Sequence, residues 1–329
     1  MRFECILPLF SVLLFSADAS PSPAVDTLLA KQDYSGANSL LVHHLDSFPN
    51  DNTALYMLIA VEQTRILDYE SYQLDAGPLY KKADSVNAVL KARLPKFKGR
   101  DSLQCLFYIA SISGYFSVLQ AKTGELFPAV KNCIESVTLL NNVIKLDSNY
   151  NEAYMGIGIF HYYLDKSFKW LSFGDANGEM EGINKLERAT LAKFPYDFAA
   201  RNSLCWIYID QEKYRAADSI AGKVLSAYPD NTIFLRIRCL SLLREKKYPE
   251  AIASGEKLSR SSLKRNPENW SDLVLASYVI SSANDELGKS KEACAAADYI
   301  LGMKIPEQYR QMGHIRKNLK RIQAIRKKC

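Results

Sequence analysis

Motifs for catalysis are absent from this chain of 329 residues. It contains no His-Glu-x-x-His, paired Cys-x-x-Cys or Gly-x-Ser-x-Gly pattern, the spacings that hold a zinc ion or a serine nucleophile. Its four histidines do not form a ligand set. His43 and His44 are adjacent and so point about 100° apart on a helix, while His161 and His314 are isolated. We therefore expect a non-catalytic protein without a metal or other cofactor.

Strand patterns are missing as well, because no stretch alternates polar and apolar residues with a period of two. Seven cysteines are too few to act as the framework of a chain this long. Cys205 and Cys239 are predicted to be buried free thiols on neighbouring helices, which lie about 8–10 Å apart, beyond the reach of a disulfide. Cys105 and Cys133 fall on two helices of one hairpin and are the better candidates for a bridge. The composition is that of a globular all-α protein.

A long apolar run occurs at the start of the chain. Arg2 precedes the apolar stretch 6–15, and Ala17-Asp18-Ala19 has the small-x-small pattern of a cleavage site. The run is shorter than the ~20 residues that span a bilayer. We interpret residues 1–19 as a signal peptide cleaved near Ala19, which predicts a periplasmic or extracellular protein. We expect no membrane-spanning helix in the rest of the chain.

A period of 34 residues organises the second half of the sequence. It separates the members of three pairs: Pro195 and Pro229, Tyr214 and Tyr248, Cys205 and Cys239. A fixed period of this length indicates a helix–turn–helix repeat array, in which each unit buries its apolar face on its neighbours. Apolar periodicity and stop signals predict helices over 34–49, 53–69, 76–93, 102–121, 126–146, 181–193, 198–210, 214–227, 232–244, 248–263, 269–286, 289–302 and 306–327.

These repeats resemble the tetratricopeptide repeat (TPR) family, in an exported bacterial type. The residues that match its pattern are Tyr154, Ile157, Gly158 and Tyr162, then Leu204, Cys205, Tyr208, Tyr214, Ala217 and Pro229, then Cys239, Tyr248 and Ala251. The match is clear from about 150 to 260, partial at 34–49, and weak between 52 and 147. The resemblance implies a right-handed superhelix whose concave groove binds a peptide or partner protein. We expect one repeat domain over 20–303 and a capping helix over 304–329.

One repeat is about a dozen residues longer than the pattern. The extra segment, 164–175, carries Phe168, Trp170 and Phe173 at a hairpin tip, close to Tyr162. Extended loops between helices are often functional. Two interpretations are open: the aromatic side chains fold back to fill a gap in the hairpin, or they contact a ligand together with Tyr162.

The end of the chain is strongly basic. Residues 304–329 contain nine Lys or Arg and one acid, Glu307, and an apolar stripe runs from Tyr309 to Ile325 at helical spacing. The helix is interpreted either as a cap on the last repeat, or as an anion site built by Arg316, Lys317, Lys320 and Arg321. The anion would be an acidic lipid, a glycan or an acidic partner; nucleic acid is not expected in an exported protein.

Together these features predict a protein- or peptide-binding scaffold of the bacterial cell envelope, with its ligand in the concave groove. The alternative is an adaptor that binds anionic membrane or glycan surfaces through the basic C-terminal helix. An enzyme would require catalytic residues distant in sequence to converge.

We predict that the mature protein begins near Ser20, because signal peptidase cleaves after a small residue in the pattern Ala17-Asp18-Ala19. N-terminal sequencing of protein purified from outside the cytoplasm checks this. An intact Met1 on protein recovered from the cytoplasm would contradict it.

Overall fold

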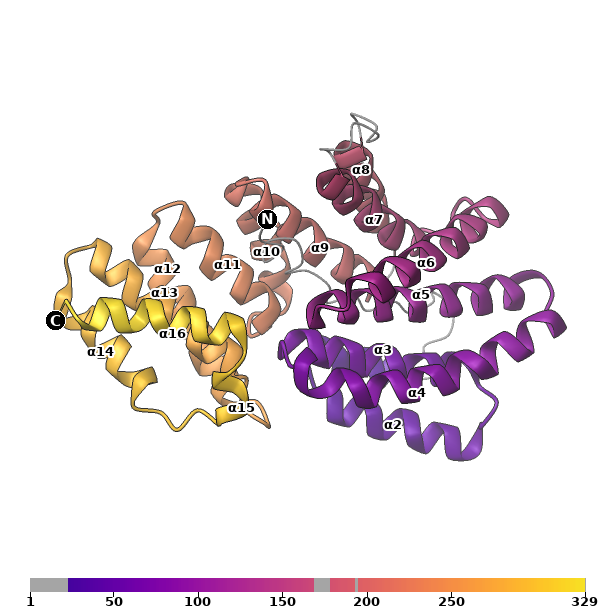
Figure 1. Ribbon diagram of the computed structural model, residues 1–329, viewed down its shortest axis with the longest axis horizontal. Coiled ribbons are helices and arrows are strands. Elements are labelled where there is room, and N and C mark those ends of the chain that lie inside the picture. Colours follow the sequence, from indigo (N-terminus) through magenta and orange to yellow (C-terminus); the bar gives the residue numbers. More distant parts are fainter. Residues whose placement is uncertain (1–22, 169–177, 193–194, 329) are drawn as a thin grey trace. The chain divides into compact units, whose positions relative to one another are not determined.

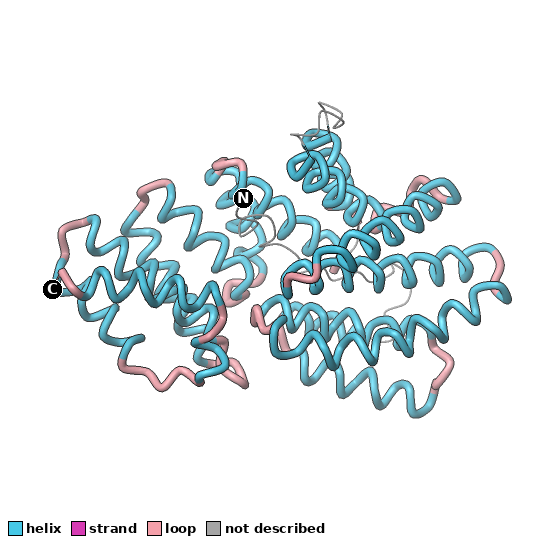
Figure 2. Tube along the Cα trace, in the orientation of Figure 1, coloured by secondary structure: helices cyan, strands magenta, loops and turns pink. Residues whose placement is uncertain are grey.

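The computed structural model describes residues 23–168, 178–192 and 195–328. Its described residues form helices joined by short turns and contain no strand (Figures 1 and 2). This confirms the predicted all-α class. The chain divides into two compact units, Met1–Leu204 and Cys205–Cys329, and each is described by itself.

Consecutive helices of the first unit pack against one another in sequence order (Figure 1). They are α1 (Pro23–Ala30), α2 (Tyr34–Ser47), α3 (Asn52–Asp68), α4 (Tyr72–Arg93), the short 3-10 turn Leu94–Lys96, α5 (Gly99–Thr123), α6 (Leu126–Leu146), α7 (Ala153–Phe168) and α8 (Gly178–Ala189). The unit boundary falls inside α9 (Tyr196–Asp210). In each pair the odd-numbered helix comes first, and we call it the inner helix.

The second unit continues the same alternation. It contains α10 (Tyr214–Ala227), α11 (Thr232–Arg244), α12 (Tyr248–Leu263), α13 (Trp270–Glu286), α14 (Ser290–Leu301), α15 (Glu307–Arg310) and α16 (Gly313–Arg326). Tyr214 and Tyr248, 34 residues apart, are each the first residue of a second helix, as are Tyr34 and Tyr72 in the first unit. The period seen in the sequence is therefore the period of the helix pairs.

The same turn closes most inner helices. One residue adopts a positive φ after the helix, and the next N–H donates to a carbonyl five residues earlier. Lys213 N–H donates to the Tyr208 carbonyl at 2.7 Å, and Lys247 N–H to the Leu242 carbonyl at 2.9 Å. In these turns the residues with positive φ are Gln32, Glu70, Gly124, Glu212, Lys246 and Gly288. This pairing satisfies carbonyls that the end of a helix would leave open.

A proline followed two residues later by Asp or Asn begins several inner helices. Asp51 caps α3 by accepting from the N–H groups of Thr53 and Ala54, and Asn231 caps α11 by accepting from Phe234 N–H. Asn269 caps α13 in the same way. Each of these caps follows a proline. Pro49 and Pro229 also help to end the preceding helix, because a proline disfavours helical backbone in the residue before it.

The first tyrosine of a second helix reaches the last turn of the following inner helix. Tyr34 hydroxyl donates to Asp68 Oδ2 at 2.9 Å, and Tyr248 hydroxyl donates to Glu286 Oε2 at 3.2 Å. Lys122 lies 5.7 Å from the centre of the Tyr72 ring at the corresponding place. These contacts link one helix pair to the next.

Small residues sit where helices approach most closely. Gly158 of α7 and Gly182 of α8 oppose each other, and a Cβ added to Gly182 would lie 2.6 Å from the Gly158 carbonyl oxygen. In the second unit Cys205 and Ala217 are both fully buried, and the Cys205 thiol lies 3.5 Å from the Ala217 carbonyl oxygen. Gly158, Cys205 and Ala217, which match the repeat pattern in the sequence, therefore lie at close helix–helix contacts.

The structure shows the state of both cysteine pairs singled out in the sequence. Cys205 and Cys239 are buried free thiols, as expected. Cys105 and Cys133, the better candidates for a bridge, are free too, so they do not link α5 to α6. The Cys105 thiol instead donates to the Leu90 carbonyl, and burial raises its pKa to about 11. Cys294 on α14 is disulfide-bonded.

Two further expectations need correction. The predicted helix 306–327 is two helices, because the backbone of Met312 is extended (φ −63°, ψ 130°) where its side chain enters the core. The helix Gly99–Thr123 is long and apolar enough to cross a membrane, contrary to the expectation for the mature chain. Its most apolar stretch is 78% buried, in keeping with a central inner helix of the stack.

We predict that Gly182→Ala lowers the free energy of unfolding by about 1–3 kcal/mol, because the new methyl group would overlap the Gly158 carbonyl and the Tyr162 backbone. Gly222→Ala is the matched control, since no atom lies within 4 Å of its added Cβ. It should raise stability by about 0.5–1 kcal/mol through helix propensity. Urea denaturation of both variants measures the difference; equal effects would contradict the close crossing.

Candidate functional site

The α7–α8 hairpin carries the extended segment that the sequence singled out. Its aromatic residues Phe168, Trp170 and Phe173 have side chains outside the described residues. Tyr162 is described and is 1% exposed, with its backbone nitrogen 2.8 Å from the position of a Cβ on Gly182. It packs in the helix crossing at the base of the hairpin and does not lie on the surface.

A small polar group lies beside Tyr162 at the base of the hairpin. His161 Nδ1 is 3.7 Å from Glu181 Oε2, and Glu181 also accepts a hydrogen bond from Lys185. Burial, then the Lys185 charge, lowers the pKa of His161, so its imidazole is neutral at pH 7. The Lys185 hydrogen bond lowers the pKa of Glu181. The sequence showed His161 as a lone residue, because Glu181 and Lys185 lie 20 and 24 residues further along the chain, on the next helix.

This arrangement offers hydrogen bonds but not a complete metal site. His161 and Glu181 provide two ligands, whereas a structural or catalytic zinc needs at least three from the protein. Across the part of the chain that the structure describes, no group of three or more His, Cys, Asp or Glu side chains is placed to hold a metal ion.

A layer of tyrosines joins the inner helices of the first unit. The rings of Tyr56 on α3 and Tyr108 on α5 stack with centres 4.2 Å apart, and the hydroxyls of Tyr56 and Tyr115 are 2.7 Å apart. Burial raises the pKa of Tyr56 and of Tyr196 well above the usual value, so these hydroxyls remain protonated. The sequence analysis missed this network, since one sequence does not reveal which tyrosines meet across 50 or more residues.

The second unit has a buried ion pair between inner helices. Arg236 Nε of α11 is 2.7 Å from Asp272 Oδ1 of α13, with side chains 6% and 0% exposed. Asn269 Nδ2 donates to the other oxygen of Asp272 at 3.0 Å. A buried charge pair of this kind fixes the register of its helices more than it stabilises them, because desolvation offsets much of the attraction. We assign it a structural role.

The turn between α2 and α3 carries a His–Asp pair beside a shallow surface depression lined by residues 44 and 47–51. His44 Nε2 is 2.8 Å from Asp51 Oδ2. The other oxygen of Asp51 accepts hydrogen bonds at the start of α3, so this carboxylate is the N-cap of the helix. We therefore assign the His44–Asp51 pair the role of stabilising the turn between α2 and α3.

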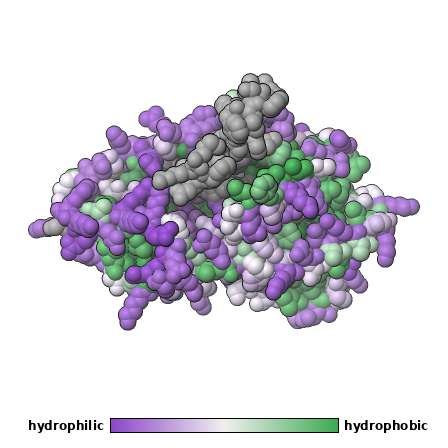
Figure 3. All heavy atoms as spheres, in the orientation of Figure 1, coloured by the Kyte–Doolittle hydropathy of each residue, from purple (hydrophilic) through white to green (hydrophobic). Residues whose placement is uncertain are grey.

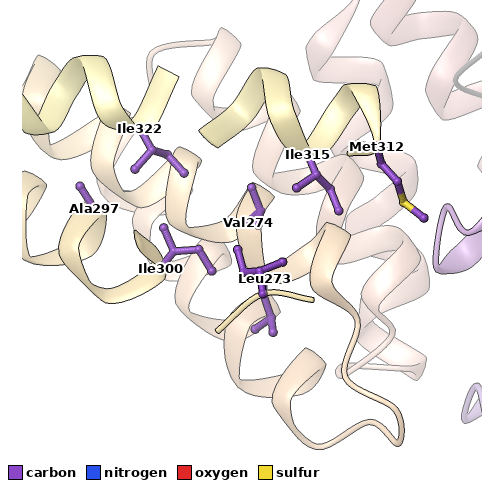
Figure 4. Close-up of a cluster of buried hydrophobic side chains, with 8 residues drawn as sticks. Leu273, Val274, Ala297, Ile300, Met312, Ile315 and Ile322 are labelled. Carbon is purple, nitrogen blue, oxygen red and sulfur yellow. The ribbon is translucent and has the colours of Figure 1, made fainter. Parts of the chain in front are cut away.

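Helix α16 covers the end of the second unit, as the capping interpretation expects. Its residues Ile315 and Ile322, with Met312 before it, pack on Leu273 and Val274 of α13 in one buried cluster (Figure 4). Leu319 packs at the edge of the same cluster. The predicted apolar stripe of α16 is therefore buried in the core of the second unit.

The opposite side of α16 is the predicted basic face. Arg316, Lys317, Lys320 and Arg321 are all exposed, and α16 contains no acidic residue. Hydrophilic residues dominate the surface over this helix (Figure 3). Arg321 lies 5.2 Å from the centre of the Tyr278 ring.

Nearby acids neutralise only the end of this helix. Arg326 is 2.5 Å from Asp298, and Lys328 is 2.5 Å from Asp285. Within the described residues, no ion pair involves Arg316, Lys317 or Lys320. The positive charge is therefore concentrated between positions 316 and 321.

Comparison with known proteins gives structural neighbours of TPR type. The C-terminal part of a TPR repeat-containing protein from Cytophaga hutchinsonii is 17% identical over 90% of this chain and 98% of that one, with a TM-score of 0.44. A tetratricopeptide repeat protein from Parabacteroides merdae is 13% identical over 91% and 96%, with a TM-score of 0.42. No family model and no curated protein matches the chain.

The chain has a TPR-like fold. Its own helix pairs, its repeated turns and its 34-residue step carry this assignment, and they confirm the resemblance expected from the sequence. The exported type remains a prediction.

Proposed function

We propose that this protein is a non-catalytic scaffold that binds a protein or peptide segment in a groove lined by its inner helices. The observation that carries the proposal is the repeated helix pair. Each pair adds one equivalent inner helix to a row, and such rows provide the extended binding surfaces of repeat proteins. We place the scaffold in the bacterial cell envelope on the strength of the leader-like sequence 1–19.

The ligand contact that we propose is the extended hairpin. Phe168, Trp170 and Phe173 lie in the segment that exceeds the repeat length, and aromatic residues are favoured where partners are held. The base of this hairpin is firmly built, because Gly158, Gly182 and Tyr162 pack in close contact. A rigid base supports a contact residue better than a loose one.

We predict that Trp170→Ala reduces partner binding by tenfold or more while leaving the thermal unfolding midpoint within about 2 °C of the wild type. The assay is chemical crosslinking of the mature protein in the envelope fraction of the source cell, followed by quantitative mass spectrometry of the captured segment. Phe48→Ala is the control, since Phe48 is an aromatic residue 60% exposed at a distant turn. A large loss of stability with unchanged capture would show that Trp170 fills the hairpin.

A second function is favoured by the basic face of α16: an adaptor that contacts an anionic membrane or glycan surface. Arg316, Lys317 and Lys320 carry charge that no described acid neutralises. Because the apolar stripe of α16 is buried in the core, the helix cannot insert it between lipids. Binding would depend on charge alone, at about 1 kcal/mol per Lys or Arg near an anionic surface.

We predict that Arg316→Glu, Lys317→Glu and Lys320→Glu together abolish binding to vesicles rich in phosphatidylglycerol, without changing stability. A vesicle sedimentation assay over a salt series measures this, and wild-type binding should weaken steeply as salt rises. Reversing Lys81, Lys82 and Lys96, which are equally exposed in the first unit, makes the same change in net charge and should have a smaller effect. If the variant with Arg316, Lys317 and Lys320 changed to Glu binds vesicles as the wild type does, the only role left for α16 is to cap the last repeat.

A further inference from the structure

Cys294 on α14 is disulfide-bonded, and its partner in the chain can be found by elimination. The chain has seven cysteines. Four of them are free thiols in the described part of the chain: Cys105, Cys133, Cys205 and Cys239. The partner is therefore Cys5 or Cys329, which lie outside the described residues. Cys5 belongs to the leader-like sequence 1–19 and would be removed with it, which leaves Cys329.

Two ion pairs hold the end of the described chain close to α14. Arg326 Nε is 2.5 Å from Oδ1 of Asp298, which lies one helical turn after Cys294 on the same face of α14. Lys328 Nζ is 2.5 Å from Oδ2 of Asp285, near the end of α13 and before the turn that leads into α14. In sequence, Cys294 therefore lies between the two acids that contact the last residues of the chain.

Helix α16 runs antiparallel to α14. Its residue Ile322 packs in one buried cluster with Ile300, near the end of α14 (Figure 4), whereas the residues after α16 contact the acid before the start of α14. Because both helices rise about 1.5 Å per residue, three residues beyond the Arg326 ion pair correspond to about three residues back along α14. This step leads along the chain to Cys329, and along α14 to within one residue of Cys294.

The chemistry of the described cysteines agrees with this pairing. The thiolate is the form that attacks a disulfide, and burial opposes ionisation of the thiol. Burial raises the pKa of Cys105, Cys133 and Cys239, and Cys205 is fully buried. Cys294 is only partly buried. The fold therefore keeps the four free thiols poorly reactive and leaves Cys294 accessible to an oxidant.

The last turn of the chain is weakly held by its noncovalent contacts. Ile322 and Ile325 are buried, so α16 is anchored up to this point. Beyond them the chain is held by the ion pairs of Arg326 and Lys328, whose side chains are 46% and 64% exposed. Exposed ion pairs contribute little, because water and salt screen them. A covalent link here would hold the cap at its weakest end.

We propose that Cys294 and Cys329 form a disulfide that fixes the capping helix α16 over the last repeat. The bond closes a loop that contains α15 and α16, so it limits how far the whole cap can move away. Without the bond, the buried cluster around Leu273 and Val274 would open to water more often. The proposal is independent of the ligand and of the surface proposed above, and it makes firm capping depend on an oxidising compartment.

Formation of the bond passes two electrons to an oxidant. The thiolate of one cysteine attacks the disulfide of oxidised glutathione or of a thiol oxidoreductase, and one sulfur of the oxidant leaves as a thiol. The second cysteine, also as a thiolate, attacks the mixed disulfide and releases the other sulfur of the oxidant as a thiol. The two protons lost by Cys294 and Cys329 balance those gained by the oxidant.

Peptide mapping of the mature chain, oxidised with oxidised glutathione and digested without reductant, tests the pairing. A protease that cleaves after glutamate should give peptide 293–307 linked to peptide 308–329, and reduction should separate them. Thiol counting in denaturant should rise from four to six on reduction. A link from Cys294 to another cysteine or to glutathione alone would overturn the proposal, as would six free thiols before reduction.

Hydrogen exchange measures the effect of the bond on the cap. In the wild type, reduction should speed exchange of the α16 amides at least tenfold and leave the α11 amides unchanged. Cys329→Ser should exchange as the reduced wild type does, with or without reductant. Its thermal unfolding midpoint should be about 5–15 °C below that of the oxidised wild type.

Cys133→Ser is the matched control, because Cys133 is a free thiol of the first unit. This variant should keep the linked peptides, and its α16 amides should respond to reductant as those of the wild type do. If the wild type carries the link but its α16 exchange does not change on reduction, the bond does not fix the cap and the proposal is overturned.

Discussion

Each inner helix of this protein must be buried on most of its sides, and much of the structure follows from that constraint. A helix between its own partner and the following pair has little contact with water, so most of the 17 residues of α3 are buried. Polar groups in such a helix need partners inside the protein. The hydroxyl pairs of Tyr56 with Tyr115 and of Thr53 with Tyr108 meet this need between α3 and α5. Arg236 and Asp272 meet it between α11 and α13.

The same constraint explains the tight turns after inner helices. A buried helix end cannot leave its carbonyls to solvent, so the chain closes them with its own N–H groups and accepts a residue at positive φ. Glu212 and Lys246 hold this conformation despite the steric cost to a residue with a side chain. In the six turns of this kind that the structure describes, the backbone hydrogen bond is therefore retained even where the residue type changes.

Local signals in the sequence were enough to predict most of the fold. Pro229 and Asn231 mark the end of one helix and the cap of the next, and Tyr214 and Tyr248 mark where second helices begin. The break at Met312 was not predictable, because it depends on the shape of a core built by α13 and α14. Of the candidate sites, the basic face of α16 follows from helical periodicity alone, whereas the burial of Tyr162 required the position of Gly182.

The burial of α5 has a consequence for how the protein is made. On the export route proposed above, a chain that crosses the membrane unfolded would carry Gly99–Thr123 through the translocon without the neighbours that cover it in the fold. A segment of this hydropathy is a candidate for lateral release into lipid. Arg100 and Asp101 at its start and the small polar residues Ser111 and Ser113 in its middle oppose that release. Selection on α5 would then act on its passage through the translocon as well as on its packing in the folded stack.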